Sequence, residues 1–175
     1  MPFALHHMID YSSDEVQIYF AGEFEGEIYH ETFKRKYIQS HFEDLRQILK
    51  RLRNLKHVGI FPEVFRMRKY NGELVIKEEG DKTDNVKALL YDEKQYVDNI
   101  FRVYCIWPVI NEKIIIIGGG CLKDSGGALQ DYEECRQTNQ KMRELGGLIQ
   151  LAIAKQELYI IEDKLKSDHR EITIL

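Results

Sequence analysis

The sequence predicts an α+β fold, with a twisted, mainly antiparallel sheet, helices packed on one side and a C-terminal helical extension. Apolar residues alternate with a period of two in several short segments before residue 118, which is typical of strands. They recur at steps of three and four over 42–55 and again beyond about residue 124, which is typical of helices. The 175 residues are 43% apolar and 31% charged, and this composition predicts a single domain over 1–175 with a substantial core.

The acidic N-terminal region, up to about residue 35, is predicted to form one or two short strands. Gly22 and Gly26 supply turn positions within it. The alternating apolar residues are Val16, Ile18, Phe20, Phe24 and Ile28.

A basic amphipathic helix is predicted to begin at Ser40. The segment from Ser40 to Glu43 has the form of a capping box, in which the serine hydroxyl accepts from a backbone amide and the glutamate reaches back. One apolar stripe follows at helical spacing, formed by Phe42, Leu45, Ile48, Leu49, Leu52 and Leu55.

The middle of the chain is predicted to supply the strands of the sheet. Asn71-Gly72 tolerates positive φ and predicts a tight basic hairpin between 64–69 and 74–77. A further strand is expected over 86–91.

Two central strands are predicted next, over 101–107 and 113–117. Pro108 ends the first because it cannot donate to a ladder, and the glycines from Gly118 to Gly120 end the second. Since only a short turn separates them, we expect an antiparallel hairpin at the centre of the sheet.

The C-terminal extension, about 125–175, is predicted to be mainly helical. Gly146-Gly147 interrupts its pattern, and two adjacent glycines cost roughly 2 kcal/mol in a helix interior relative to alanine. We therefore expect a kink, a break or a very close packing contact there. The isoleucines near residues 160 and 172 predict a late short strand or an ordered tail.

The net charge of -4 is unevenly distributed along the chain. Residues 1–33 have seven Asp or Glu and no Lys or Arg, whereas 34–56 have eight Lys or Arg and two Asp or Glu. The acidic total disfavours a surface that binds nucleic acid everywhere, but the basic segment allows a local contact with RNA phosphates. The alternative, which the residues alone favour, is a solvated helix face. The candidate RNA-binding residues are Arg46, Lys50, Arg51 and Arg53.

The three cysteines, Cys105, Cys121 and Cys135, fit neither a paired disulfide framework nor the CxxC hooks of a zinc site. We therefore expect three reduced thiols. The N-terminus has no basic segment before an apolar stretch, and no apolar run approaches the roughly 18 residues that span a bilayer. We expect a cytoplasmic protein without membrane association.

Motifs for several common chemistries are absent or imperfect. The glycine cluster from Gly118 to Gly127 resembles a phosphate loop, but Asp124 follows Lys123 where a P-loop has Ser or Thr. HExxH, GxSxG and paired CxxC motifs are absent, and the six histidines do not form a metal site by spacing. We expect no metal and no cofactor.

Basic residues on or beside the predicted central strands are the candidates for chemistry. Arg102 and Tyr104 share one strand face. The other bases of the set are Arg66, Arg68, Lys69, Lys87 and Lys123, and Tyr132 lies near them in sequence. Fixed cations beside a phenol suit phosphoryl chemistry, because they stabilise charge on a phosphorus-bound oxygen while Tyr or Lys relays a proton. The alternative, which the residues alone favour, is a solvent-facing sheet whose long cations cover apolar surface.

The order of segments over roughly residues 40–125 carries a family resemblance. The basic helix precedes Phe101-Arg-Val-Tyr-Cys-Ile, a short turn, Glu112-Lys-Ile-Ile-Ile-Ile and a glycine-plus-lysine ending. This order resembles the RelE/HigB/ParE superfamily of bacterial toxins, whose pattern is an aromatic-Arg-apolar-aromatic strand, an acidic turn, an apolar strand and a Gly-Lys/Arg terminus. It is similar in particular to a larger branch with a longer N-terminal region and a C-terminal helical extension.

The resemblance implies the toxin of a type II toxin-antitoxin system, a metal-independent endoribonuclease. Ribosome-dependent members cut messenger RNA in the ribosomal A site by driving a 2'-hydroxyl onto the adjacent phosphate. The implied partners are the ribosome with its mRNA and a helix-turn-helix antitoxin. By motif, Arg102 matches the arginine of the first strand, and Lys123 stands near the base that follows the second. Lys87 matches a family lysine more weakly, and Tyr132 stands near a downstream tyrosine of some members.

Departures from the family pattern leave other functions open. The glycine cluster is longer, Asp124 follows the key lysine, and the total charge is acidic where ribosome-cutting toxins are usually basic. The alternatives are a non-catalytic protein-binding relative on the same scaffold and a ParE-like inhibitor of gyrase.

Overall fold

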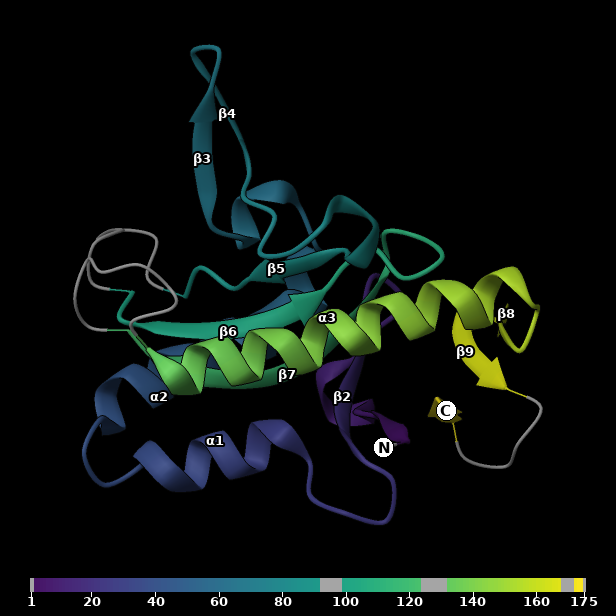
Figure 1. Cartoon of the computed structure of the whole chain (residues 1–175), viewed down its shortest axis with the longest axis horizontal. Helices are drawn as coiled ribbons and strands as arrows, with labels where there is room; N and C mark the ends of the chain where they lie inside the picture. The colour runs from purple at the N-terminus through teal and green to yellow at the C-terminus, as the bar shows by residue number, and fades with distance from the viewer. Residues whose placement is uncertain (1, 92–98, 124–131, 168–171, 175) are drawn as a thin grey trace.

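The computed structural model describes residues 2–91, 99–123, 132–167 and 172–174 (Figure 1). Its centre is a six-stranded sheet in the order β10-β1-β2-β7-β6-β5, in which the described strands pair antiparallel except for the parallel pair β2 and β7. The predicted α+β class with a mainly antiparallel sheet is confirmed. These strands are β1 Phe3–His7, β2 Gln17–Glu23, β5 Val86–Ala88, β6 Phe101–Ile106, β7 Ile114–Leu122 and β10 Ile172–Ile174.

Two hairpins stand apart from the main sheet. The Asn71-Gly72 turn joins β3 and β4, as predicted, and a second hairpin of β8 and β9 follows the last helix. These strands are β3 Met67–Tyr70, β4 Glu73–Ile76, β8 Leu158–Ile161 and β9 Lys164–Ser167. The helices are α1 Tyr29–Tyr37, α2 Phe42–Val58 and α3 Glu133–Ala154, with short 3-10 turns at Ile9–Tyr11, Pro62–Val64 and Lys82–Asp84.

Helices cover both faces of the main sheet. α1 and α2 pack on one face, where Phe33 and Leu52 share a core with Val103 of β6. The packing of α1 and α2 is the predicted packing of helices on one side of the sheet. The C-terminal helix α3 adds a layer on the opposite face, where Met142 shares a second core with Tyr104, and Figure 1 shows α3 crossing β6 and β7. Among the described helices, none combines the length and the apolar character that crossing a bilayer requires.

The N-terminal region differs in part from the prediction. β2 confirms the first expected strand, but residues 24–28 do not form a second one, and helix α1 follows directly. The buried residues of α1 are His30, Phe33 and Tyr37, a spacing of three and four. That spacing gives α1 a helical apolar stripe toward the sheet.

The start of α2 also differs from the predicted capping box. The helix begins at Phe42 after His41, and no side chain caps its N-terminus. The Ser40 hydroxyl instead bonds to Nδ1 of His41 at 2.8 Å and to the carbonyl oxygen of Tyr37 at 3.5 Å. Ser40 therefore closes the end of α1 rather than opening α2.

β7 continues through the glycine triplet instead of ending before it. A Cβ added at Gly120 would lie 2.9 Å from the ring of Phe33 in α1, and one added at Gly118 would come within 3.0 Å of Met142 in α3. The triplet thus lets helices on both faces approach the same strand.

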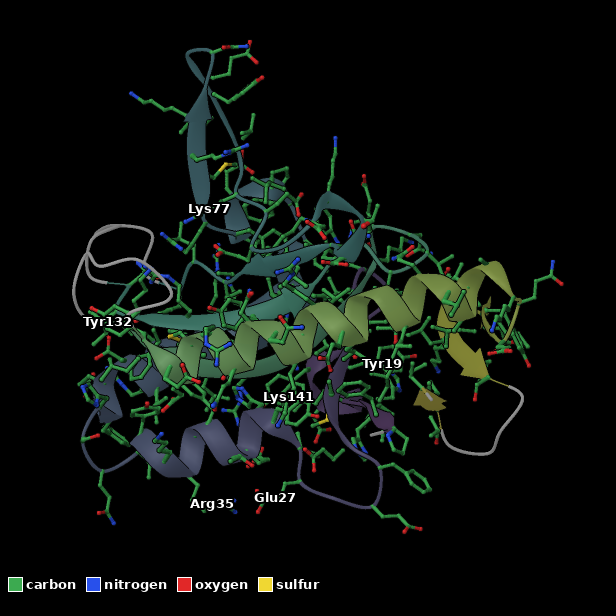
Figure 2. All side chains as sticks on the ribbon, in the orientation of Figure 1. Tyr19, Glu27, Arg35, Lys77, Tyr132 and Lys141 are labelled. Atoms are coloured by element: carbon green, nitrogen blue, oxygen red, sulfur yellow. A yellow bond between two sulfur atoms is a disulfide. The ribbon has the colours of Figure 1, made fainter. Side chains whose placement is uncertain are left out.

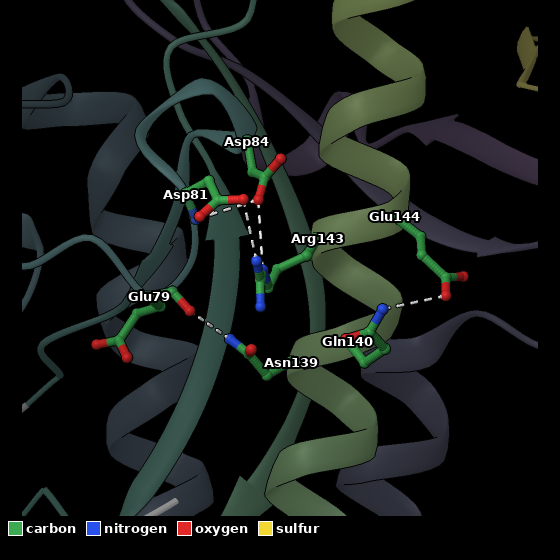
Figure 3. A network of polar contacts seen from close by, with 7 residues as sticks. All are labelled: Glu79, Asp81, Asp84, Asn139, Gln140, Arg143 and Glu144. Atoms are coloured by element: carbon green, nitrogen blue, oxygen red, sulfur yellow. Dashed lines mark hydrogen bonds and ion pairs between the residues drawn. The ribbon is translucent and has the colours of Figure 1, made fainter.

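Helix α3 is continuous through Gly146 and Gly147. Of the three expected outcomes, a kink, a break or a close packing contact, the structure shows the packing contact. A Cβ added at Gly146 would come within 3.0 Å of the backbone carbonyl oxygen of Asp84. Arg143, one turn earlier, bonds to Asp81 at 3.2 Å and to Asp84 at 3.4 Å (Figure 3). The segment between β4 and β5 is therefore held against α3.

The two glycines of α3 should respond in opposite ways to alanine. At Gly146 the added methyl meets backbone, and overpacking of this kind costs about 1–3 kcal/mol. At Gly147 the nearest atom to an added Cβ is 3.9 Å away, so helix propensity should raise the free energy of unfolding by about 1 kcal/mol. Urea denaturation of Gly146→Ala and Gly147→Ala measures both effects, and equal stabilisation by the two would contradict the packing contact.

The expectation of three reduced thiols is wrong. Cys121 near the end of β7 and Cys135 in the first turn of α3 form a disulfide, with Cα atoms 5.2 Å apart, while Cys105 is free and buried. The two cysteines are 14 residues apart in sequence, and the packing of α3 on β7 brings them together. Spacing alone does not reveal such a pair.

Candidate functional site

Four basic residues from three parts of the fold gather at one end of the sheet, and we call Arg66, Lys77, Arg102 and Lys123 the basic cluster. Arg102 lies on β6, and Lys123 directly follows β7 beside it, where its N–H donates to the Ile100 carbonyl oxygen at 2.6 Å. Arg66 and Lys77 flank the β3–β4 hairpin and face each other, because the Lys77 N–H donates to the Arg66 carbonyl oxygen at 2.9 Å.

The hairpin base is attached to the edge of the main sheet next to Tyr104. The Arg66 N–H donates to the carbonyl oxygen of Ala88 at 2.9 Å, and Ala88 lies opposite Tyr104 in the β5–β6 register. Since side chains in one cross-strand row share a face, Arg66 and Tyr104 lie on the same face of the sheet. Arg102 pairs in register with Cys121, which shares a core with Tyr104, so Arg102 belongs to that face as predicted.

The cations of the basic cluster lie close enough for their charges to act on Lys123. The pKa of Lys123 is lowered by burial first, and then by the charges of Arg102, Lys77 and Arg66, while Glu79 opposes the shift. The described groups that act on Lys123 are thus three cations and one carboxylate. A site with this excess of positive charge favours an anionic ligand.

Glu79 anchors the basic cluster to both the hairpin and α3. Its carboxylate pairs with Arg66 at 3.2 Å, and the two side chains are only 9% and 13% exposed. Its backbone carbonyl oxygen accepts from Nδ2 of Asn139 in α3 at 2.8 Å (Figure 3). Glu79 is therefore held in place from two directions.

Tyr104 lies beneath the basic cluster with an unused hydroxyl. The side chain is fully buried, and its hydroxyl has no hydrogen-bond partner within the part of the chain that the structure describes. Burial raises the pKa of Tyr104, Glu79 raises it further, and Arg102 and Arg66 oppose the shift. The phenol therefore stays protonated at neutral pH.

The remaining groups around the cluster are held in place by local contacts. Nη1 of Arg102 donates to the carbonyl oxygen of Asn99 at 2.6 Å. Nζ of Lys123 lies 5.9 Å from the ring centre of Tyr132, a cation–π distance. In Figure 2, Lys77 and Tyr132 lie toward the same end of the molecule. The structure therefore brings Arg102, Tyr104, Lys123 and Tyr132 together.

The structure does not bring Lys87 to this site. Lys87 pairs in register with Cys105, whose side chain lies in the core on the opposite face from Tyr104. It is 4% exposed and pairs with Glu78 at 3.2 Å. Burial lowers the pKa of Lys87, and Glu78 opposes this shift. Lys87 is thus a buried, paired lysine.

The four candidate RNA-binding residues lie on α2, which covers the opposite face of the sheet from the basic cluster. A groove of about 920 Å³ follows this helix and Tyr91. Arg46, Lys50 and Arg53 are exposed beside it, and Arg46 pairs with Glu43 at 3.2 Å. Arg51 is buried and donates to the Glu63 carbonyl oxygen at 3.5 Å. The two predicted basic regions therefore do not form one surface.

The contribution of the hairpin base to the site is not predicted from the sequence. Lys77 is not among the predicted site residues, and Arg66 is named only as one of the bases on or beside the strands. A signal was available, because the two-residue turn at Asn71-Gly72 fixes a register that places Arg66 opposite Lys77. What the sequence does not show is the attachment of residue 66 to β5.

Within the described residues, no group of three histidine, cysteine, aspartate or glutamate side chains is arranged to hold a metal ion. The groups that the basic cluster offers are cations, including a lysine of lowered pKa. In comparisons with known proteins, no family model matches the chain, and no curated protein and no solved structure is significantly similar to it.

Proposed function

We propose that the chain is a toxin of the RelE/HigB type, a metal-independent endoribonuclease that cuts messenger RNA on the ribosome. The observation that carries this proposal is the basic cluster. Arg102 and Lys123, the two residues that the family resemblance selects, act on each other electrostatically and are joined there by Arg66 and Lys77. An RNA phosphate is the anion that such a site would bind.

In the proposed reaction, the 2'-hydroxyl attacks the adjacent phosphorus and loses its proton to water. The bond from phosphorus to the 5'-oxygen breaks, which leaves a 2',3'-cyclic phosphate and a 5'-hydroxyl. Arg102 and Lys77 stabilise the charge that builds on the phosphate oxygens. The Lys123 ammonium, whose lowered pKa makes it a better acid, gives its proton to the leaving oxygen. Tyr104 is buried below and takes no direct part.

The proposed partners follow from the same activity. The substrate is mRNA held by the ribosome, and a helix-turn-helix antitoxin would neutralise the toxin. The site of action would then be the cytoplasm. Because thiols are kept reduced there, the Cys121–Cys135 bond should not be required for RNA cleavage.

Expression of the chain should stop growth and cut messages, and Arg102→Ala and Lys123→Ala should each restore growth. One positioned proton-transfer group contributes about 10²–10⁴-fold to a rate. Growth curves and northern blots after induction measure both effects. The matched controls are Arg35→Ala, whose residue forms an exposed ion pair on α1, and Lys155→Ala at the far end of α3.

Unchanged growth and intact messages on expression of the wild-type chain would overturn the proposal. Full burial of the Tyr104 side chain favours one alternative, a non-catalytic relative that binds a protein partner. That alternative predicts a stable complex with a small helix-turn-helix protein and no cut RNA. A gyrase inhibitor would instead cause DNA damage with intact messages.

A further inference from the structure

The β3–β4 hairpin projects from the body of the protein (Figure 1). Its turn residues Asn71 and Gly72 have φ values of 50° and 83°, as a tight two-residue turn requires. The tip is solvent-exposed, with Tyr70 at 58% and Leu74 at 66% of full exposure. The tip therefore contributes little to the core, and its residues are free to serve recognition.

The register of the hairpin divides its side chains between two faces. In the register of the hairpin, Tyr70 pairs with Glu73 and Arg68 with Val75. The next such pair toward the base of the hairpin is Arg66 with Lys77. Because side chains alternate along a strand, these three pairs share one face, which we call the basic face of the hairpin. The other face contains Met67, Lys69, Leu74 and Ile76.

The basic face of the hairpin leads directly into the basic cluster. Arg66 and Lys77 belong to both, and Lys77 acts on Lys123. On the opposite face, Ile76 packs against the core on the α2 side of the sheet. The hairpin therefore presents its basic face toward the side of the sheet that holds Tyr104 and Arg102.

The chemistry of the basic face combines cations with an exposed aromatic ring. The Arg68 guanidinium lies 5.7 Å from the ring centre of Tyr70. Among the described residues, neither Arg68 nor Lys77 has an ion-pair partner, whereas Arg66 is paired with Glu79. Glu73 is the one carboxylate within the three pairs that form the face. Two unpaired cations and a ring suit a phosphate backbone with unstacked bases.

We propose that the basic face of the hairpin binds single-stranded RNA and leads it to the basic cluster. Binding of RNA by the hairpin does not depend on the proposed cleavage. Only the delivery of the strand to a cutting site rests on the proposed function. A base stacks on Tyr70, and Arg68 and Lys77 contact phosphates along the strand. A single strand is the fitting ligand because its bases are open to stacking, whereas those of a duplex are paired and stacked on each other.

The test is fluorescence anisotropy with a labelled 12-nucleotide oligouridine in which every 2'-hydroxyl is methylated, so that binding is measured without cleavage. Arg68→Ala/Tyr70→Ala should weaken binding at least about tenfold, since stacking on an aromatic ring is worth about 1–3 kcal/mol per base. Lys69→Ala/Leu74→Ala, on the other face of the same hairpin, should change binding less than about twofold. The affinity of Arg68→Ala/Tyr70→Ala should also depend less steeply on salt concentration than that of the wild-type chain, because one phosphate contact is lost.

The outcomes separate this inference from the proposed function. If the wild-type chain cuts messages but the two double variants bind the oligonucleotide equally, the hairpin inference is overturned and the proposed function stands. If no message is cut but Arg68→Ala/Tyr70→Ala alone loses binding, the inference stands and the proposed function fails. Equal binding by both variants together with loss of a protein complex by Arg68→Ala/Tyr70→Ala would identify the hairpin as a protein-docking surface and overturn the inference. Unchanged thermal unfolding of both variants serves as the folding control.

Discussion

Replacing Arg66 with methionine is expected to lower the free energy of unfolding by about 3–5 kcal/mol. Arg66 and Glu79 form an ion pair at 3.2 Å, with side chains only 13% and 9% exposed. Without the guanidinium, the Glu79 carboxylate keeps its position with little access to water but loses the cation that contacts it directly. An uncompensated buried charge is among the most destabilising changes that a single substitution makes. Urea denaturation followed by circular dichroism measures the change.

The double variant Arg66→Met/Glu79→Met should recover most of the lost stability, because removing both charges also removes the desolvation penalty. Arg35→Met provides the exposed comparison. Its pair with Glu27 has a distance of 2.7 Å, but both side chains are more than 60% exposed, so the loss should be far smaller than for Arg66→Met. Equal losses for Arg66→Met and Arg35→Met would show that the Arg66 pair is not buried in the way described.

Removing the disulfide should also have a large effect. Closing a loop of about 15 residues restricts the unfolded chain by an amount worth about 3 kcal/mol, and the two cysteines are 14 residues apart. The variant Cys121→Ala/Cys135→Ala should therefore unfold about 6–12 °C lower than the oxidised wild-type chain. Differential scanning calorimetry with and without a reducing agent measures the difference.

Sensitivity to the reducing agent distinguishes the bond from simple packing. The wild-type chain and Cys105→Ala should both lose stability on reduction, because Cys105 is the free cysteine. Cys121→Ala/Cys135→Ala should not respond. A wild-type melting temperature that does not change on reduction would show that the bond does not form in solution.

Local patterns in the sequence account for the strands better than for the helices near them. The alternation in β6, the apolar run that begins β7 and the turn at Asn71-Gly72 are local signals, and the structure confirms these strands and their pairing, although β7 continues through the glycines. Helix α1 was missed because Phe24 and Ile28 extend the alternation of β2, although residues 24–28 leave the ladder. The Cys121–Cys135 bond depends on how α3 packs on β7, which no local pattern contains.

In the candidate site too, local patterns predict some features, and contacts between distant segments decide the others. Alternation along β6 correctly places Arg102 and Tyr104 on one face. The place of Lys87 depends on the register of β5 with β6, which sets it opposite Cys105 and on the other face. Arg66 and Lys77 enter the site only because residues 65 and 66 attach to β5, a contact between segments more than 20 residues apart in the sequence. Residue chemistry was therefore predictable, but the full membership of the site was not.

The most direct test of RNA cleavage by the basic cluster is to map the ends of a defined message after incubation with programmed ribosomes and the purified protein. The wild-type chain should produce fragments that end in a 2',3'-cyclic phosphate, and a 2'-deoxy nucleotide at the cut position should prevent cutting there. Arg102→Ala/Lys123→Ala should leave the message intact, whereas Lys155→Ala should cut like the wild-type chain. An intact message with the wild-type protein, or equal cutting by Arg102→Ala/Lys123→Ala, would contradict the account.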